Sequence, residues 1–581
     1  MTAFEIVPAS FDAASVAREA RRDHRLRNWP VVYTLDSDRP GKRRVYVGQT
    51  NSVVSRMPQH FKVRPHMESI HVLLHEEFNR SVALDLEAWL IARFQGDPEI
   101  RVENAVTGEQ GNDYFDHERY RAMFPDAFAK LRDAGLFSLD LDGIENTEFF
   151  KLSPFKTLTE EQELAVQEVL DGFFEGLRTG SGSSFLIEGE PGTGKTIVAI
   201  TILKQIVDVA RFNPADDDEQ GERIAEHRSA IFRALLPKDL KIGFVVPQQA
   251  LRETIQRVFE KTSGLSGSMV LTPYDVANSP DSFDLLVVDE AHRLEQPGNH
   301  GTQNKRYEDA GRAACGEGGE ASTMLDWIIA KSQSRVLLAD VQQSIRPVDL
   351  PADALTKLRD TGRSHVLRSQ LRVRAGDVYL SYVRDLLRGV ATEPANIRSD
   401  YDFRLYDDPL AMYEAIQARN REVGLARMLA GFAWDWPKAT RNDPDAVHVV
   451  VGDLALPWNR AQKDWVNSAG AIGEVGCIHT IQGYDLNYAA VIIGPDLKMD
   501  PETGQVRFDW DAYRDPRKER GSRKRGIAAH SDEDLLEDIV NIYYVLMTRG
   551  ILGTYVYVVD PVLREYLRQF IPAAVPESAD I

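Results

Sequence analysis

The chain has 581 residues, a length that predicts three or four domains, and its 43% hydrophobic and 27% charged residues are the composition of a soluble globular protein. Its formal net charge of −20 argues against a protein that coats nucleic acid non-specifically, although a local basic groove is compatible with it. The lack of a long apolar run, of a leader-like start and of more than two cysteines argues against a membrane protein, a secreted protein and a disulfide scaffold, so we expect a cytoplasmic protein.

The first predicted elements form a hairpin near the N-terminus. Residues 31–35 and 44–48 are β-rich, and the turn-forming residues 36–41 lie between them. Each of the two runs carries one tyrosine, Tyr33 and Tyr46. Taken singly, both tyrosines also fit a buried core.

Two helices are expected after the hairpin. The first carries Arg56 and His60 four residues apart, and residues 84–94 predict an amphipathic helix that carries Glu87. Single-metal phosphodiester cleavage needs a carboxylate for Mg²⁺, a base for water and a cation for the phosphate, and these residue types supply all three. Glu87 alone also fits a solvated helix face.

In this order and spacing, residues 28–115 resemble a GIY-YIG nuclease. The resemblance implies that Tyr33 activates water, and it implies roles for Tyr46 (second motif tyrosine), Gly48 (motif glycine), Arg56 (phosphate), His60 (next helix residue), Glu87 (metal) and Asn104 (late asparagine). Two departures are Val31-Val32 in place of Gly-Ile, and Pro58. The proline predicts a disturbed helix between Arg56 and His60 unless it lies in the first turn.

Residues 116–156 are expected to be a linker, and a helix starts after it. Thr159 is a suitable N-cap, and the amide of Gln162, just upstream of the next motif, has the paired donor and acceptor that read an adenine edge.

A phosphate-binding loop follows. Residues 189–196 read Gly-Glu-Pro-Gly-Thr-Gly-Lys-Thr between an apolar strand (185–187) and a predicted helix (197–206), which is the context of a P-loop. Glycines in such a loop turn backbone N–H groups onto phosphates, the lysine reaches the outer phosphates, and the threonine binds Mg²⁺. The expected nucleotide-binding residues are therefore Gly189, Gly192, Gly194, Lys195 and Thr196.

Two buried strands then deliver polar residues. Residues 284–290 predict a strand that ends in Asp289, for Mg²⁺, and Glu290, for the attacking water. Residues 336–340 predict another strand, and Gln343 past its end is expected to sense the γ-phosphate.

The motifs 367–374, 479–485 and 544–550 complete a ladder that resembles a superfamily 1 helicase over residues 157–562. The resemblance assigns Arg372 and Arg549 to reach the γ-phosphate from a second domain, and Gln482, Gly483 and Asp485 to the fifth motif, with Asp where that family usually has Glu. Because large inserted subdomains are lacking, the motor resembles the reduced ATPase module of Schlafen-type proteins. Residues 213–238 and 295–320 are expected to be surface loops, and 514–525 is strongly basic.

We therefore expect an α/β chain: a small α+β GIY-YIG domain (1–115), a linker (116–156) and two RecA-like parallel-sheet domains (157–355 and 356–575). The expected function is ATP-dependent cleavage of nucleic acid, DNA rather than RNA, with ATP and Mg²⁺, or Mn²⁺ at the nuclease site. Pairing a nuclease with a motor suggests restriction of foreign DNA or anti-phage defence.

Two alternatives stay open. One is a nucleic-acid translocase or remodeller with an inactive nuclease, and the other is a nucleotide-gated switch that binds a protein. The sequence also leaves open a protein partner or a homo-oligomer, and it predicts no membrane partner.

Overall fold

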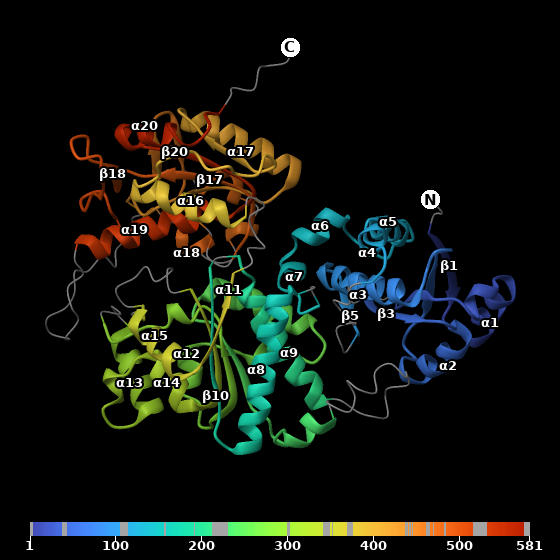
Figure 1. The fold of residues 1–581 in the computed structure, drawn as a ribbon. Helices are drawn as coiled ribbons and strands as arrows, with labels where there is room; N and C mark the ends of the chain where they lie inside the picture. Colours follow the sequence, from blue (N-terminus) through green and yellow to red (C-terminus); the bar gives the residue numbers. More distant parts are fainter. Residues whose placement is uncertain are drawn as a thin grey trace, which may run out of the picture. The chain divides into compact units, whose positions relative to one another are not determined.

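The computed structural model describes all residues except 1–3, 38–42, 105–113, 156–157, 191, 212–229, 299–302, 341–348, 351, 369–375, 436–439, 441–442, 444–445, 461–464, 469, 482–483, 515–531 and 575–581. Contacts between residues divide the chain into two compact units. Figure 1 labels the helices and strands and colours them along the sequence, from blue at the N-terminus to red at the C-terminus. Unit 1 is Met1–Gly180, Thr196–Leu240 and Thr254–Val270, and unit 2 is Ser181–Lys195, Lys241–Glu253 and Leu271–Ile581. This division differs from the expected boundaries, because parts of the expected first RecA-like domain belong to unit 1.

Unit 1 contains a five-stranded sheet in the order β1-β4-β2-β3-β5. The strands are β1 (Glu5–Ser10), β2 (Val31–Ser37), β3 (Arg43–Thr50), β4 (Ser69–Leu74) and β5 (Ile100–Val102). The pairs are antiparallel except β3 with β5, which is parallel. The predicted hairpin is confirmed as β2 and β3, and its register sets Tyr33 opposite Gly48.

Helices cover both faces of this sheet. One face packs against α1 (Ala13–Arg22) and α2 (Val53–Val63), and the other packs against α3 (Arg80–Gly96). The expected disturbance at Pro58 is wrong, because α2 runs unbroken through this proline, which is its sixth residue. The Ser52 cap and the buried side chains of Val53, Met57 and His60 hold the helix on both sides of the lost hydrogen bond.

The predicted helix around Glu87 is confirmed as α3, but it is not amphipathic. Most of its side chains are buried, because the sheet covers one side and further helices pack on the other. These are α4 (His117–Arg121), α5 (Phe124–Asp133), α6 (Leu141–Asn146) and α7 (Glu148–Lys151), within the stretch we expected to be a linker. Phe124, Phe128 and Ile144 from this stretch share a core with α3, so it is folded onto the N-terminal sheet.

Other helices of unit 1 include α8 (Glu160–Thr179), α9 (Lys195–Arg211) and, from Thr254 onward, α11 (Gln249–Lys261). Thr159 caps α8 as predicted. Gln95 of α3 donates from Nε2 to Thr262 Oγ1 over 3.0 Å, and both side chains are buried. The end of α3 is therefore bound to the end of α11.

Unit 2 contains a six-stranded sheet in the order β11-β6-β10-β9-β7-β8. Its strands are β6 (Ser184–Gly189), β7 (Ile242–Val245), β8 (Val270–Leu271), β9 (Phe283–Val288), β10 (Ser332–Ala339) and β11 (Arg363–Leu367). The pairs from β11 to β7 are parallel, which agrees with the predicted RecA-like fold. The helices of this part are α12 (Pro273–Ala277), α13 (Asn304–Cys315), α14 (Met324–Lys331) and α15 (Ala352–Thr361).

The expectation of a surface loop over residues 295–320 is wrong for its second half. Residues 304–315 form α13, whose Tyr307, Ala310 and Gly311 are buried. Tyr307 lies against Trp327 of α14, with ring centroids 4.8 Å apart. Helix packing against α14 therefore outweighs the polar, glycine-rich composition.

The second sheet of unit 2 has the order β12-β20-β17-β13-β16, and all its pairs are parallel. Its strands are β12 (Asp402–Leu405), β13 (Ala426–Ala430), β16 (Val475–Gly476), β17 (Leu486–Ile493) and β20 (Gly550–Val558), beside the hairpins β14 (Val449–Val451) with β15 (Leu454–Leu456) and β18 (Leu497–Met499) with β19 (Val506–Phe508). Its helices are α16 (Asp377–Arg388), α17 (Pro409–Val423), α18 (Ile478–Ile481), α19 (Asp532–Met547) and α20 (Pro561–Arg568).

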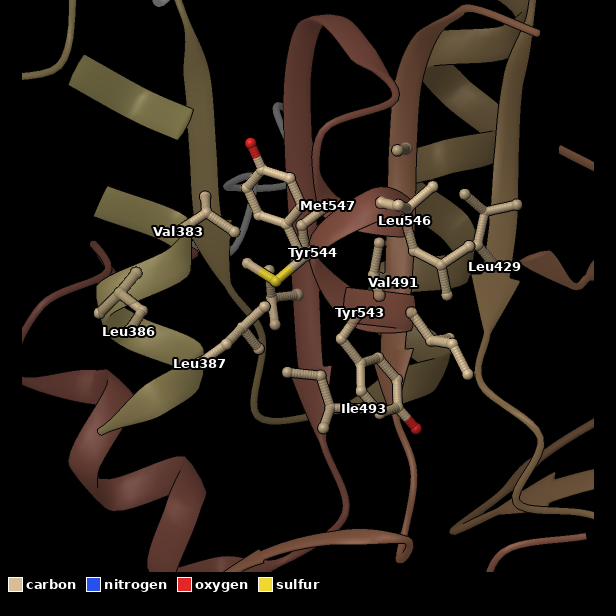
Figure 2. Close-up of a cluster of buried hydrophobic side chains, with 14 of the residues drawn as sticks. Val383, Leu386, Leu387, Leu429, Val491, Ile493, Tyr543, Tyr544, Leu546 and Met547 are labelled. Carbon is tan, nitrogen blue, oxygen red and sulfur yellow. The ribbon is translucent and has the colours of Figure 1, made fainter. Parts of the chain in front are cut away.

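The core of this part lies where α16 and α19 meet β17. Figure 2 shows Val383, Leu386 and Leu387 of α16 beside Tyr544 and Met547 of α19, with Val491 and Ile493 of β17 in the same cluster. None of the described helices is long and apolar enough to cross a membrane.

Candidate nucleotide and phosphodiester sites

The P-loop connects β6, which ends at Gly189, to α9, which begins at Lys195. Gly192 and Gly194 have φ angles of 89° and 80°, in the left-handed region that glycine adopts at little cost. Lys195 Nζ donates to the carbonyl oxygens of Gly189 (2.6 Å) and Glu190 (3.1 Å), so the amine lies over the loop. A Cβ at Gly189 would collide with Thr193 Oγ1. This tight, glycine-shaped loop with its lysine fits a phosphate group, and Thr196 follows as the second residue of α9.

Asp289 and Glu290 follow β9 directly. Asp289 is fully buried, and its Oδ1 accepts a hydrogen bond from the Glu290 N–H over 3.0 Å. Glu290 has a φ of 52°, a strained conformation for a residue with a side chain. Burial opposes its ionisation, but His292 and Lys195 outweigh burial and hold the pKa of Glu290 below its usual value. The carboxylate is therefore charged at neutral pH, as polarising a water requires.

His292, which the sequence analysis missed, connects two strand ends. Its Nδ1 accepts from the backbone N–H of Asp340, after β10, over 3.1 Å, and its Nε2 lies 3.1 Å from Glu290 Oε2. Because a backbone N–H only donates, Nδ1 is the acceptor, and the neutral imidazole carries its hydrogen on Nε2. The sequence feature that could have identified His292 is its position two residues after Glu290, in Asp-Glu-Ala-His.

Two residues that were predicted to contact the nucleotide form hydrogen bonds with the protein main chain in this structure. Gln162 is buried, and its Oε1 accepts from the N–H of Thr159 over 3.0 Å in a capping box, so the helix start uses the acceptor assigned to adenine. Arg549 is buried, and its Nε donates to the Val545 carbonyl oxygen over 3.2 Å and its Nη1 to that of Tyr484 over 3.4 Å. Its guanidinium therefore bonds main-chain carbonyls around α19 in this structure, and its reach to the γ-phosphate stays a prediction.

Asp485 is half-buried immediately before β17. Gln343, Arg372, Gln482 and Gly483 lie outside the described residues. Within unit 2, an arginine that we did not predict reaches the P-loop: Arg384 of α16 donates from Nη2 to Glu190 Oε1 over 3.2 Å. The hydroxyl of Tyr544 donates to Glu190 Oε2 over 3.3 Å.

The predicted nuclease residues gather on the N-terminal sheet. The hydroxyl oxygen of Tyr33 lies 2.7 Å from His60 Nε2, and the Tyr46 ring centroid lies 5.0 Å from that of His60. Arg56, on the same helix, donates to Gln59 Oε1 over 2.9 Å. The structure thus brings side chains of β2, β3 and α2 together in one cluster.

Gly48 and Asn104 shape this point. A Cβ at Gly48 would lie 2.5 Å from Tyr33 Cζ, so only glycine lets the ring cross the neighbouring strand. Asn104 is buried and bonds both main-chain groups of Val47, accepting from its N–H (3.0 Å) and donating to its oxygen (2.8 Å). Asn104 therefore holds the strand next to Gly48.

Charges act on both tyrosines. Burial raises the pKa of Tyr33 and of Tyr46, and the negative charge of Glu87 raises both further. Arg56 opposes these effects at both hydroxyls. Burial, with the charges of Arg64 and Arg56, lowers the pKa of His60 to about 3, so this imidazole is neutral at physiological pH. Glu87 and Arg56 therefore share the electrostatic environment of the two tyrosines.

Arg64 is a further functional candidate that sequence reasoning missed. Its Nη1 lies 3.0 Å from His60 Nδ1, and its guanidinium carbon lies 3.9 Å from the centroid of the Tyr46 ring. The sequence feature that could have identified Arg64 is its position four residues after His60. Arg56, His60 and Arg64 are thus spaced at intervals of four residues, which is the spacing of neighbours on one helix face.

Residues 182–560 match the Schlafen group 3, DNA/RNA helicase domain. The chain belongs to this family. The Schlafen group 3 helicase domain covers the chain from β6 to β20, including the P-loop, Asp289 and Glu290, whereas the cluster around Tyr33 lies outside it.

The chain is also similar to a curated protein and to several solved structures. An uncharacterized protein of Saccharomyces cerevisiae is 27% identical over 457 residues, which cover 71% of this chain and 90% of that protein. Nonstructural protein 10 (helicase) of an arterivirus is 13% identical with a TM-score of 0.26, and the match covers 67% of this chain and 61% of that chain. The structure of its complex with DNA is 13% identical with a TM-score of 0.28, and the match covers 69% of this chain and 67% of that chain. Domain III of the Thermotoga maritima replication initiation protein DnaA is 14% identical with a TM-score of 0.19, and the match covers 40% of this chain and 70% of that chain.

Proposed function

We propose that this member of the Schlafen group 3 helicase family is an ATP-dependent nuclease of nucleic acid, with DNA as the expected substrate. The observation that carries the proposal is the cluster of Tyr33, Tyr46, Arg56 and His60 in the same chain as a helicase-like domain with a P-loop. A fold alone does not assign an activity, and the chemistry of these side chains is what supports this one.

At the P-loop, the chain's own groups fit ATP hydrolysis. Lys195 leaves the loop carbonyls and neutralises the outer phosphates, and Glu290 accepts a hydrogen bond from the attacking water. Its lowered pKa keeps it ionised for that role. Asp289 is the carboxylate that would hold Mg²⁺, which shields charge on the phosphates when bound.

At the N-terminal cluster, the groups fit cleavage of a phosphodiester. The hydroxyl oxygen of Tyr33 accepts a hydrogen bond from the attacking water and so orients it, and Arg56 stabilises the negative charge that develops on the phosphate. Glu87 is the carboxylate that would hold Mg²⁺ or Mn²⁺, which polarises the phosphate when bound. Asn104 and Gly48 keep β3 in the position that Tyr33 requires.

The test is cleavage of supercoiled plasmid with Mg²⁺ or Mn²⁺, with and without ATP. We expect the wild type to nick or cut the plasmid, Glu87→Gln to lose cleavage while it keeps ATPase activity, and Lys195→Ala to lose ATP hydrolysis and the response of cleavage to ATP. Glu68→Gln and Lys305→Ala are matched controls, because both side chains are exposed and lie outside the two sites.

Cleavage that survives in Glu87→Gln would assign the activity to another site or a contaminant. If the wild type cuts neither plasmid nor single-stranded RNA, the nuclease proposal fails. ATP hydrolysis that DNA or RNA accelerates would then favour a translocase, and hydrolysis that neither accelerates would favour a nucleotide-gated protein switch.

The biological role we propose, restriction of foreign DNA, rests on the pairing of a nuclease with a motor. Expression in a bacterial host should lower phage plating or plasmid uptake, and Glu87→Gln should restore both. Equal plating with both proteins would contradict this role.

A further inference from the structure

We propose that Arg64 is a positioning residue that fixes the hydrogen of His60 on Nε2, so that His60 donates a hydrogen bond to the oxygen of Tyr33. The proposal rests on the proposed nuclease function for its catalytic meaning, but its geometric part can be tested without cleavage.

The first step is the direction of the two hydrogen bonds. Arg64 Nη1 lies 3.0 Å from His60 Nδ1, and a guanidinium has five donors and no acceptor. Nδ1 must therefore accept, and a neutral imidazole that accepts at Nδ1 carries its hydrogen on Nε2. Nε2 lies 2.7 Å from the hydroxyl oxygen of Tyr33, which consequently accepts.

The second step is what holds Arg64. The guanidinium carbon lies 3.9 Å over the ring of Tyr46, which is a cation–π geometry. The backbone N–H of Arg64 also bonds the carbonyl oxygen of His60 over 2.7 Å, which fixes the end of α2. The ring of Tyr46 therefore serves as a platform for Arg64.

The consequence concerns the role of His60. An imidazole whose Nε2 carries hydrogen cannot take the proton of Tyr33, so His60 is not the base for this tyrosine. Instead its Nε2–H donates to the Tyr33 oxygen and makes the hydroxyl hydrogen point away from the imidazole. The burial of His60 and its two arginine neighbours, Arg56 and Arg64, keep it neutral.

The geometric test is ¹⁵N NMR of the full-length protein labelled at histidine, with the His60 signal assigned from His60→Gln. We expect a protonated Nε2 and a bare Nδ1 in the wild type, and a mixture of tautomers in Arg64→Met. Arg64→Lys, which keeps one donor, should restore much of the Nε2–H form, and Tyr46→Phe, which keeps the platform, should leave it unchanged. A protonated Nδ1 in the wild type overturns the proposal, whether or not the protein cuts DNA.

The functional test is plasmid cleavage kinetics. Loss of such a supporting group should lower kcat by about 10- to 100-fold in Arg64→Met with KM nearly unchanged. In a His60→Gln background the same substitution should have no further effect, because the two residues act as a unit. Lys62→Met, an exposed cation on the same helix, is the control.

A raised KM, a DNA-binding salt slope that falls by about one, and equal losses in both backgrounds would instead assign Arg64 to a substrate phosphate. That result would overturn the positioning role and leave the nuclease proposal intact. A wild type that cuts nothing would reject the nuclease proposal, and the tautomer measurement would still decide the geometric one.

Discussion

At the scale of single residues, the N-terminal cluster depends on close contacts across the hairpin. Tyr33 crosses over Gly48, with no space for a side chain there. The sequence predicted both residues from the resemblance, but it gave no reason for the glycine. The register of β2 and β3 supplies that reason, because it sets the two residues directly opposite each other.

Gly48→Ala should therefore destabilise the protein and displace Tyr33 from His60. An added Cβ 2.5 Å from Tyr33 Cζ forces the ring or the strand to move, and overpacking of this kind costs about 1–3 kcal/mol. Urea unfolding measures the change, and plasmid cleavage should fall with it. Gly473→Ala is the control, because no atom lies within 4 Å of the added Cβ. Equal stability of the two variants would show that Tyr33 does not pack over Gly48.

His60 should make stability depend on pH. Its pKa is about 3 in the folded protein against 6.5 for an ordinary histidine, so below pH 6.5 the unfolded chain binds one more proton. The contribution of His60 to the free energy of unfolding is complete above pH 6.5. Below it, the free energy of unfolding falls by about 1.4 kcal/mol per pH unit as the pH drops toward 3. Comparing urea unfolding of the wild type and His60→Gln at pH 7, 6 and 5 isolates this slope. His24→Gln, at an exposed position, should keep the wild-type slope, and so would His60→Gln if the pKa of His60 were the same in the folded and the unfolded chain.

At the scale of elements, the ATPase site is built where parallel strands end. β6, β9 and β10 were predicted from their apolar runs, and the structure confirms that they are neighbours in the sheet. Their order was not predictable, because β9 and β10 are separated from β6 by long stretches of chain. Only the sheet shows that His292, after β9, meets Asp340, after β10.

His292→Phe should lower both stability and ATP turnover. It leaves the buried N–H of Asp340 without its acceptor, which costs about 1–3 kcal/mol, and it removes the contact to Glu290. We expect kcat for ATP to fall about 10- to 100-fold with little change in KM. His292→Gln, which keeps an acceptor and a donor, should recover much of both in urea unfolding and ATPase assays. Wild-type turnover in His292→Phe would show that Glu290 does not need this contact.

At the scale of the whole molecule, the chain combines a Schlafen group 3 helicase domain with an N-terminal sheet that lies outside the family match. The expected linker instead adds α4–α7 to the core of the N-terminal unit. Within unit 2, Arg384 and Tyr544, far apart in sequence, both contact Glu190 of the P-loop. These contacts connect the loop with α16 and α19.

Arg384→Ala should lower ATP turnover, because it removes a cation that lies beside the P-loop. Arginines that stabilise phosphoryl transfer have large effects, so we expect a loss of about tenfold or more in kcat, with little effect on folding. Arg388→Ala is the control, because Arg388 is on the same helix but pairs with Glu537 at the surface. Steady-state ATPase assays with both variants decide the point. If Arg384→Ala matches its control, the contact with Glu190 is an ordinary ion pair.

The sequence alone determined the local features: the hairpin, the strands before the P-loop and before Asp289, and the start of α8. These follow from periodicity, capping and turn residues, which act between near neighbours in the chain. The candidate site residues also come from the sequence, because motif spacing is local, and their roles stay predictions.

Only the tertiary structure decided how those residues are supported. Arg64 meets His60 because Tyr46, from another strand, carries its guanidinium, and His292 meets Asp340 because two strands are adjacent. The same holds for Pro58 and for α13, where packing overrides the local signal. The physical reason is that a side chain's partner across the fold depends on which distant segments bury the same apolar surface, and no spacing along the chain encodes that choice.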